Sequence, residues 1–252
     1  MEFLPADIDA TAAAALIAAT FVGNMLSAAM GIGGGIILLA VMASLMPAAA
    51  IIPIHGIVQF GANIFRGTIH RAHIDWMTFV WFAMGSVVGV AVGGSVVVAL
   101  PPDILRGALG LFFLYTVWGP KLKFFGESNL VIVVVGMVSS VLTMFFGATG
   151  PFAAALLSQR GYTPQELIGT HSACMGAQHA LKIVAFGFLG FAFADWLGLI
   201  VLMLLAALAG TLVGSYVLRR MSASTFATAL KVLLTVLAVN LLAVAFGLYA
   251  IT

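Results

Sequence analysis

The stretch WMTFVWFAMGSVVGVAVGGSVVVA, residues 76–99, decides the class of fold. It contains no Asp, Glu, Lys or Arg and is long enough to cross the hydrocarbon core of a bilayer as an α-helix. Gly85, Gly89 and Gly93 recur at every fourth position, and Gly210 and Gly214 repeat the spacing later. This spacing favours close packing between membrane helices, within one chain or in a dimer. The stretch therefore predicts a tightly packed transmembrane helix.

The composition of the whole chain extends this prediction to a polytopic membrane protein. Of 252 residues, 63% are hydrophobic and only 7% are charged. A soluble domain carries about 45–50% apolar and about 25% charged residues. The apolar runs are long and do not alternate in polarity, so we expect helices rather than a β-barrel. The net charge of +2 is too small to indicate nucleic-acid binding, and the single cysteine, Cys174, excludes an intrachain disulfide.

Apolar runs separated by charged residues, Pro or Gly predict an all-α integral membrane protein of about ten segments. We expect these segments at residues 11–30, 36–46, 51–68, 76–99, 103–119, 130–146, 152–159, 166–192, 196–218 and 225–250. The second and the seventh are too short to cross as simple lipid-facing helices. Backbone of this kind is tolerated inside protein or beside a water-filled cavity. Both short segments therefore indicate a functional interior.

The two halves of the chain repeat each other. An offset of 116 residues joins Gly31 to Gly147, His55 to His171, Asn63 to His179 and Arg66 to Lys182. An offset of 120 then joins Asp75-Trp76 to Asp195-Trp196 and Gly94-Ser95 to Gly214-Ser215. Matches in register at polar and glycine positions indicate an internal duplication. We expect a first repeat at 1–120, a cytoplasmic linker at 121–129 and a second repeat at 130–252.

The charge distribution predicts that the two repeats are inverted. Five segments per half is an odd number, so the halves insert in opposite orientations if all five cross. With the 66–75 loop in the cytoplasm, eight of the ten Lys and Arg residues fall on or near the inner face. Arg106 falls outside, and Lys182 lies within a span. We expect both termini outside the cytoplasm.

Two glycine-rich breaks precede the short segments, GIGGG at 31–35 and GATGP at 147–151. Glycine allows close approach to the backbone, and a helix N-terminus offers unpaired N–H groups that favour anions. Close helix packing is the alternative explanation. We expect Gly34 and Gly35 to lie nearest a ligand, with few packing contacts. Together the breaks contribute Gly33, Gly34, Gly35, Gly147, Thr149 and Gly150 to the predicted substrate site.

Polar residues form matching stripes on two of the long segments. His55, Gln59 and Arg66 lie on one helical face with Asn63 beside them, and His171, Gln178 and Lys182 repeat the arrangement. Ionisable residues inside a span are costly and indicate function. There are two alternatives. The side chain of Arg66 reaches the inner membrane surface, or the histidines are ordinary core residues with their hydrogen bonds satisfied. Lys182 lies deep in its span without an acid in that span, so we expect it to contact an anion or to lose its proton.

Catalytic and cofactor signatures are missing from the sequence. There is no HExxH, GxSxG or Walker motif, and no pair of acids lies inside the spans. No carboxylate joins the histidines within the spans, so no metal site is expected. We therefore predict a protein that is not an enzyme and needs no cofactor.

The turn AAMGIGGGIILL at 28–39 resembles the N-terminal hallmark of the TauE/SafE family, also called the sulfite exporter or 4-toluene sulfonate uptake permease family. Pro47, the polar third segment and the basic loop ending in Asp75-Trp76 are similar too, and GATGP with YTPQELIGTH at 162–171 resembles the family's second repeat. The resemblance covers nearly the whole chain. It implies transport of small sulfur-containing anions such as sulfite, thiosulfate or sulfoacetate. Where the family more often has Ser or Thr, this chain has His55 and Gln59, whose donors would also suit a carboxylate.

The residues and the resemblance together predict a secondary carrier. We expect it to move a small organosulfonate or sulfur oxyanion across the bacterial inner membrane by alternating access around a midplane site. An anion channel, a carrier for a small carboxylate, and an accessory subunit without transport are the alternatives. The expected partners are the anion and the lipid bilayer, with a homodimer as one option and no nucleic acid.

Overall fold

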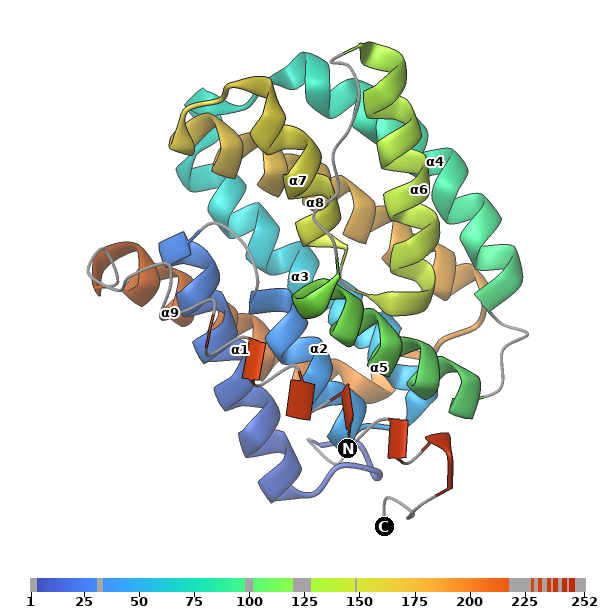
Figure 1. Cartoon of the computed structure of the whole chain (residues 1–252). Helices are drawn as coiled ribbons and strands as arrows, with labels where there is room; N and C mark the ends of the chain where they lie inside the picture. Colours follow the sequence, from blue (N-terminus) through green and yellow to red (C-terminus); the bar gives the residue numbers. More distant parts are fainter. Residues whose placement is uncertain are drawn as a thin grey trace.

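The computed structural model describes residues 4–30, 34–97, 102–119, 128–147 and 149–217, with isolated positions between 228 and 247. Within these ranges the chain forms α-helices and short 3-10 turns, and no strand (Figure 1). The helices are α1 (Ala10–Met30), α2 (Gly34–Leu45), α3 (Ala48–Ile69), α4 (Trp76–Val97), α5 (Pro102–Trp118), α6 (Asn129–Phe146), α7 (Gly150–Leu157), α8 (Pro164–Phe188) and α9 (Leu197–Val217). The all-α prediction is confirmed.

Three pairs of long helices build the molecule. α4 lies beside α6, α1 lies beside α9, and α3 packs against α8 between them (Figure 1). The short helix α2 packs against α1 and α3, and α7 packs against α6 and α8. The largest buried cluster is formed by aliphatic side chains of α2 and α3, together with residues of α1 and α9. The short helices are therefore placed inside the protein.

Glycines bring the helices of two of these pairs into backbone contact. A Cβ added at Gly85 or Gly89 of α4 would collide with the backbone carbonyl of Val133 or Met137 of α6. In the α1–α9 pair, a Cβ at Gly210 would collide with the carbonyl of Phe21. Gly214 stands in the same relation to the next turn of α1. The predicted packing role of these glycines is confirmed, and their contacts lie within the chain.

Five of the described helices are long and apolar enough to cross a membrane: α1, α3, α4, α6, and α9 with the 3-10 turn Phe193–Trp196 before it, as the segment Phe193–Tyr216. The prediction of ten segments is not confirmed by the described residues. α5 is shorter, at 17 residues, and α8 is long enough but carries many polar residues. The segment expected at 225–250 and the linker at 121–129 fall largely outside the described residues.

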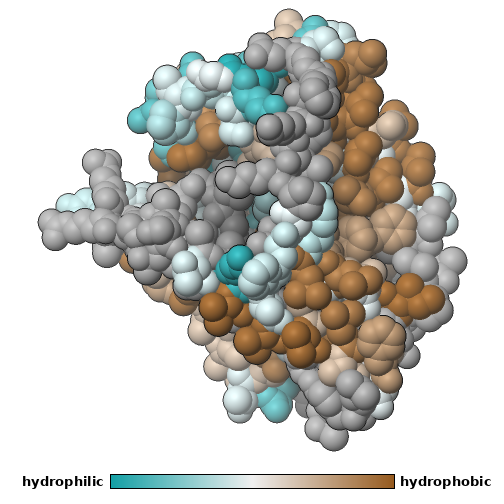
Figure 2. All heavy atoms as spheres, viewed as in Figure 1, coloured by the Kyte–Doolittle hydropathy of each residue, from teal (hydrophilic) through white to brown (hydrophobic). Residues whose placement is uncertain are grey.

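The outer surface of the paired helices is apolar. On α4, Met84, Val87 and Val88 are each at least half exposed, and Leu130 of α6 is exposed as well. Figure 2 shows this apolar surface in brown over α4 and α6, on the right of the view. Such a surface is expected of helices whose solvent is lipid.

Each of the two short helices, α2 and α7, begins where a glycine break ends. α6 ends at Phe146, and Gly147 follows with φ of 74°, a conformation that favours glycine. α7 then begins at Gly150, whereas 152 was expected. α1 ends at Met30 and α2 begins at Gly34, two residues before the expected start. Gly31, Gly33 and Ala148 lie outside the described residues.

A capping box fixes the start of α8. The Thr163 hydroxyl accepts from the Glu166 N–H, and the Glu166 carboxylate accepts from the Thr163 N–H. Pro164 occupies the first helical position, where its missing N–H is not needed. These local signals set the register of the polar face that follows along α8.

Candidate functional site

The polar stripes of α3 and α8 face each other in the interior. The rings of His55 on α3 and His179 on α8 meet edge to face, with centroids 5.9 Å apart. A Cβ at Gly56 of α3 would lie 2.9 Å from Cε of Lys182 on α8. The buried polar residues of this α3–α8 seam are His55, Gln59, Asn63, Arg66, His171, Gln178, His179 and Lys182. The structure thus buries all the stripe residues that the sequence singled out, and it brings His55 and Lys182 to the contact between the two helices.

Two cations lie in this seam without acidic partners. The Lys182 side chain has no exposed surface, and its ammonium donates to the carbonyl of Gly147 at 3.1 Å. Arg66 is 6% exposed and donates from Nη2 to Oδ1 of Asn63 at 2.9 Å. Arg66 is therefore buried in the protein and does not extend to the inner membrane surface. No carboxylate of the described part pairs with either cation. A buried charge without a counter-charge is costly, so the seam favours an anion.

Several polar atoms of the seam have no hydrogen-bond partner among the described residues. They are Nδ1 of His55, Nε2 of Gln59, Nε of Arg66 and Nδ1 of His179. Most buried polar atoms in proteins are paired, because an unpaired one costs about 1–3 kcal/mol. Gln59 Nε2 and Arg66 Nε are donors in every protonation state. In a neutral ring Nδ1 of His55 accepts, because Nε2 donates to the Gly35 carbonyl, whereas Nδ1 of His179 can donate or accept. These atoms make the seam suited to a polar guest.

The first short helix is tied to α3 and α1 at its first turn. His55 Nε2 lies 2.9 Å from the carbonyl oxygen of Gly35. A Cβ at Gly35 would meet the Gln59 side chain at 3.1 Å, so Gly35 faces the polar seam and packs closely against it.

Gly34 behaves differently from the prediction. Its N–H donates to the Ser27 hydroxyl at 2.7 Å, and an added Cβ would collide with the carbonyl of Gly23 on α1. The expectation that Gly34 is free of packing contacts is therefore wrong. Gly35 faces the seam and Gly34 packs on α1, because successive helix residues point about 100° apart.

The second short helix is held in a similar way. His171 Nε2 lies 3.0 Å from the carbonyl oxygen of Gly150, as His55 does from that of Gly35. The Gly147 carbonyl accepts from both Lys182 and the Thr143 hydroxyl. Thus α3 contacts the first turn of α2 through His55, and α8 contacts the second glycine break through His171 and Lys182.

Gln178 and Thr149 belong to a closed hydrogen-bond network. The Gln178 amide donates to Thr149 Oγ1 at 2.8 Å and to the Ser139 carbonyl at 3.2 Å. The Ser139 hydroxyl contacts both Thr149 Oγ1 and Gln178 Oε1. Because their polar groups are already paired, these two residues hold α6, α7 and α8 together beside the seam. On α3, Nε2 of Gln59 has no hydrogen-bond partner among the described residues.

His179 is the seam residue that the predicted site did not include. It is buried, it touches His55, and its Nδ1 is unpaired. The sequence carried one signal for it, the match of Asn63 to His179 at the repeat offset. Asn63 was placed in the site, and the same register would have placed His179 there too.

A second polar cluster lies where the 70–75 loop meets the start of α8. Asp75 caps α4 by accepting from the Met77 and Thr78 N–H groups, and its own N–H donates to the Thr170 hydroxyl. Tyr162 donates to the Asp75 carboxylate. Partial burial raises the pKa of Asp75, but these hydrogen bonds outweigh it and bring the pKa below its ordinary value. The two loops joined here both belong to the face predicted to be cytoplasmic.

The described part holds no group of three or more His, Cys, Asp or Glu side chains that could bind a metal ion. The same part combines apolar membrane helices with buried cations and unpaired donors between two polar helices. These features define the class as a multi-pass membrane protein with a polar, cationic interior.

The sequence pattern of the family described as Sulfite exporter TauE/SafE matches residues 15–241, and the chain belongs to this family. The predicted resemblance is thereby confirmed. The family is one of transporters, so the chain is a multi-pass membrane protein of the sulfur-anion transporter class, with a small anion and the bilayer as partners. No curated protein and no solved structure matches the chain.

Proposed function

We propose that this protein is a secondary carrier for a small organosulfonate or sulfur oxyanion, such as sulfoacetate or sulfite, in the bacterial inner membrane. The anion binds in the α3–α8 seam and is exposed to each side in turn. The observation that carries the proposal is the pair of buried cations, Lys182 and Arg66, on facing helices without a carboxylate partner in the described part.

The unpaired donors of the seam suit a sulfonate in particular. A sulfonate spreads one charge over three weakly basic oxygens and so gains from several donors rather than one strong base. Gln59 Nε2, Arg66 Nε and, in one tautomer, His179 Nδ1 can supply such donors, besides the ammonium of Lys182. The predicted site residues Gly35, His55, Asn63, Gly150 and His171 then position these donors. Gly34, Gly147, Thr149 and Gln178 support the breaks.

The two inverted repeats are part of the proposal. Three correspondences support them: the His55 and His171 contacts to the first turns of α2 and α7, the facing of α3 and α8, and the glycine-packed pairs α1–α9 and α4–α6. Alternating access follows if one repeat rocks against the other around the seam.

Purified full-length protein in liposomes tests the function. A carrier exchanges labelled sulfoacetate or sulfite for unlabelled anion inside and saturates with concentration, whereas a channel gives large conductance without counterflow. In a thermal-shift series, a bound anion raises stability by about 2.7 kcal/mol at a concentration of 100 Kd. Sulfonates, sulfite and thiosulfate should shift the melting temperature, and small carboxylates should shift it less. No shift and no flux with any sulfur anion would refute the proposal.

Cysteine labelling tests the inverted topology separately. In a Cys174→Ala background, Asp7→Cys should label from outside and Ser128→Cys from the cytoplasm. Both positions are exposed. If both label from the same side, the ten-segment inverted arrangement is wrong, whatever the substrate.

A further inference from the structure

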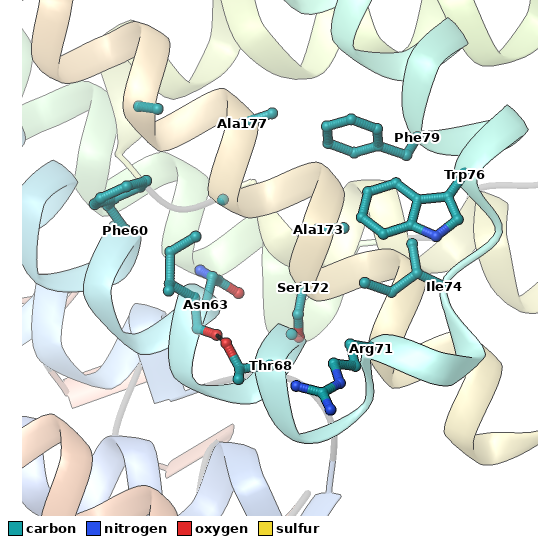
Figure 3. A pocket seen from close by; sticks show the side chains of 14 residues that line it. Phe60, Asn63, Thr68, Arg71, Ile74, Trp76, Phe79, Ser172, Ala173 and Ala177 are labelled. Carbon is teal, nitrogen blue, oxygen red and sulfur yellow. Dashed lines mark hydrogen bonds between the residues drawn. The ribbon is translucent and has the colours of Figure 1, made fainter.

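A lateral groove of about 390 Å³ lies on the outer side of the α3–α8 pair, and of the seam residues named above Asn63 alone lines it. It runs between α3, α8 and the start of α4, as Figure 3 shows. Phe60 and Ile64 line it from α3, Ala173 and Ala177 from α8, and Phe79 from α4. Almost all of its lining is apolar. The groove would therefore accept a hydrocarbon rather than a hydrated ion.

Small side chains on α8 create the hollow. Ser172, Ala173, Gly176 and Ala177 present little volume to the larger α3 residues opposite. A Cβ at Gly176 would still lie 3.7 Å from Cδ1 of Ile64, an ordinary contact distance. Space for a flexible chain thus remains beside α8.

The groove opens on the outer face of the molecule. Ile64 is 47% exposed and Trp76 is 58% exposed, and both line it. Trp76 opens α4, next to the polar 70–75 loop. Tryptophan at such a helix end is typical of the boundary between hydrocarbon and headgroups. The occupant therefore enters from the bilayer.

A cation stands at the loop end of the groove. Arg71 is exposed and lines the groove beside Thr68 and Ile74 (Figure 3). The carboxylate next in sequence, Asp75, is engaged by Tyr162 and Thr78 instead. The charge of Arg71 is thus available to an anionic headgroup, and the cytoplasmic leaflet, where this loop is expected, is rich in anionic lipid.

We propose that this groove is a binding site for one acyl chain of an anionic phospholipid, whose phosphate is held by Arg71. Burial of methylene groups against Phe60, Ile64 and Phe79 supplies the apolar part of the affinity. Arg71 supplies the preference for an anionic headgroup, about fivefold for one cation near a membrane surface.

Lipid retention on the purified full-length protein tests this site. We would measure bound lipid by native mass spectrometry, and melting temperature, after adding phosphatidylglycerol or phosphatidylcholine to delipidated protein. The wild type should retain phosphatidylglycerol about fivefold better, and Arg71→Gln should remove that preference while Arg71→Lys keeps part of it. Ala177→Phe should fill the groove and abolish retention of both lipids.

A matched control is Gly187→Phe, on the same helix but at a glycine with open space around it. It should bind lipid as the wild type does. Equal retention of the two lipids by the wild type, or unchanged retention in Ala177→Phe, would overturn the proposal. So would binding of a small water-soluble sulfonate that Ala177→Phe abolishes while neither lipid binds, since the groove would then be a substrate subsite. Arg71 is exposed, so its variants remain informative even if Ala177→Phe fails to fold.

Discussion

The α4–α6 pair and the α3–α8 pair are both buried helix contacts, but different groups fill them. Between α4 and α6, glycines bring the two backbones into contact, and the Ser140 hydroxyl there has no hydrogen-bond partner among the described residues. On α3 and α8, the eight buried polar side chains of the seam include two cationic residues. Several donors of the seam also lack a partner in the described part, and a bound anion would supply one.

The comparison explains how a chain with few polar residues can both pack and bind. In lipid there is no hydrophobic force between helices, so close backbone contact holds the outer pairs together. The α1–α9 pair repeats this device through Gly210 and Gly214. These rigid pairs flank the seam. The cationic groups of the seam are therefore flanked by helix pairs whose buried polar side chains are uncharged.

The largest expected effect concerns Lys182. Lys182→Met keeps the volume and removes the charge, so sulfonate affinity should fall by about 3 kcal/mol, or roughly 150-fold. The melting temperature should stay or rise, because an unpaired buried charge is removed and the Gly147 carbonyl still accepts from Thr143. Binding titration and thermal unfolding of the same sample measure both. Unchanged affinity would make Lys182 a structural residue. The α3–α8 interface would then not differ from the α4–α6 interface by using a buried cation to bind an anion.

Gly89→Val should show the reverse pattern. Its side chain would collide with the Met137 carbonyl, and Ser140 Cβ lies 2.8 Å from the first added carbon, so the helices must separate. We expect a loss of about 2–3 kcal/mol of stability, with the anion affinity of the surviving folded fraction preserved. Gly187→Val, at an open glycine, is the control and should be nearly neutral. A Gly89→Val protein of normal stability would show that close contact does not hold α4 to α6.

His55→Leu and His171→Leu compare the two halves of the seam. Each substitution removes the contact that holds the first turn of one short helix. If the halves contribute alike, each should weaken anion binding by about 1–1.5 kcal/mol, roughly tenfold. Isothermal titration of the two variants side by side decides this. A large effect from one and none from the other would place the anion in a single half.

The smallest effect is expected at the loop cluster. Tyr162→Phe removes one hydrogen bond to a partly exposed carboxylate, which should lower stability by about 1 kcal/mol at neutral pH. Since the folded-state pKa of Asp75 lies below its ordinary value of 3.8, this stabilisation is present above that pH. It is lost as the pH falls through the folded pKa. Unfolding of wild type and variant across pH 3–8 should show a constant difference that shrinks only at the acid end.

Sequence reasoning reached the fold class, the family and the polar stripes, because all three are written in composition and in helical spacing. An uncharged run of apolar residues can only be a membrane helix, and residues four apart share a face of it. The glycine ridge of α4 followed from the same spacing. The inverted repeats and the substrate remain predictions that labelling and transport assays can test.

Only the tertiary structure decided which polar groups are already paired. Gln178 and Thr149 satisfy each other with Ser139, Gly34 packs on α1 while Gly35 faces the seam, and His179 joins His55. Sequence spacing gives the face of a helix but not the rotation and depth at which that face meets another helix. The lateral groove also depends on tertiary packing. It exists because small residues of α8 lie opposite large residues of α3, which are more than 100 positions away in the sequence, so no local pattern predicts it.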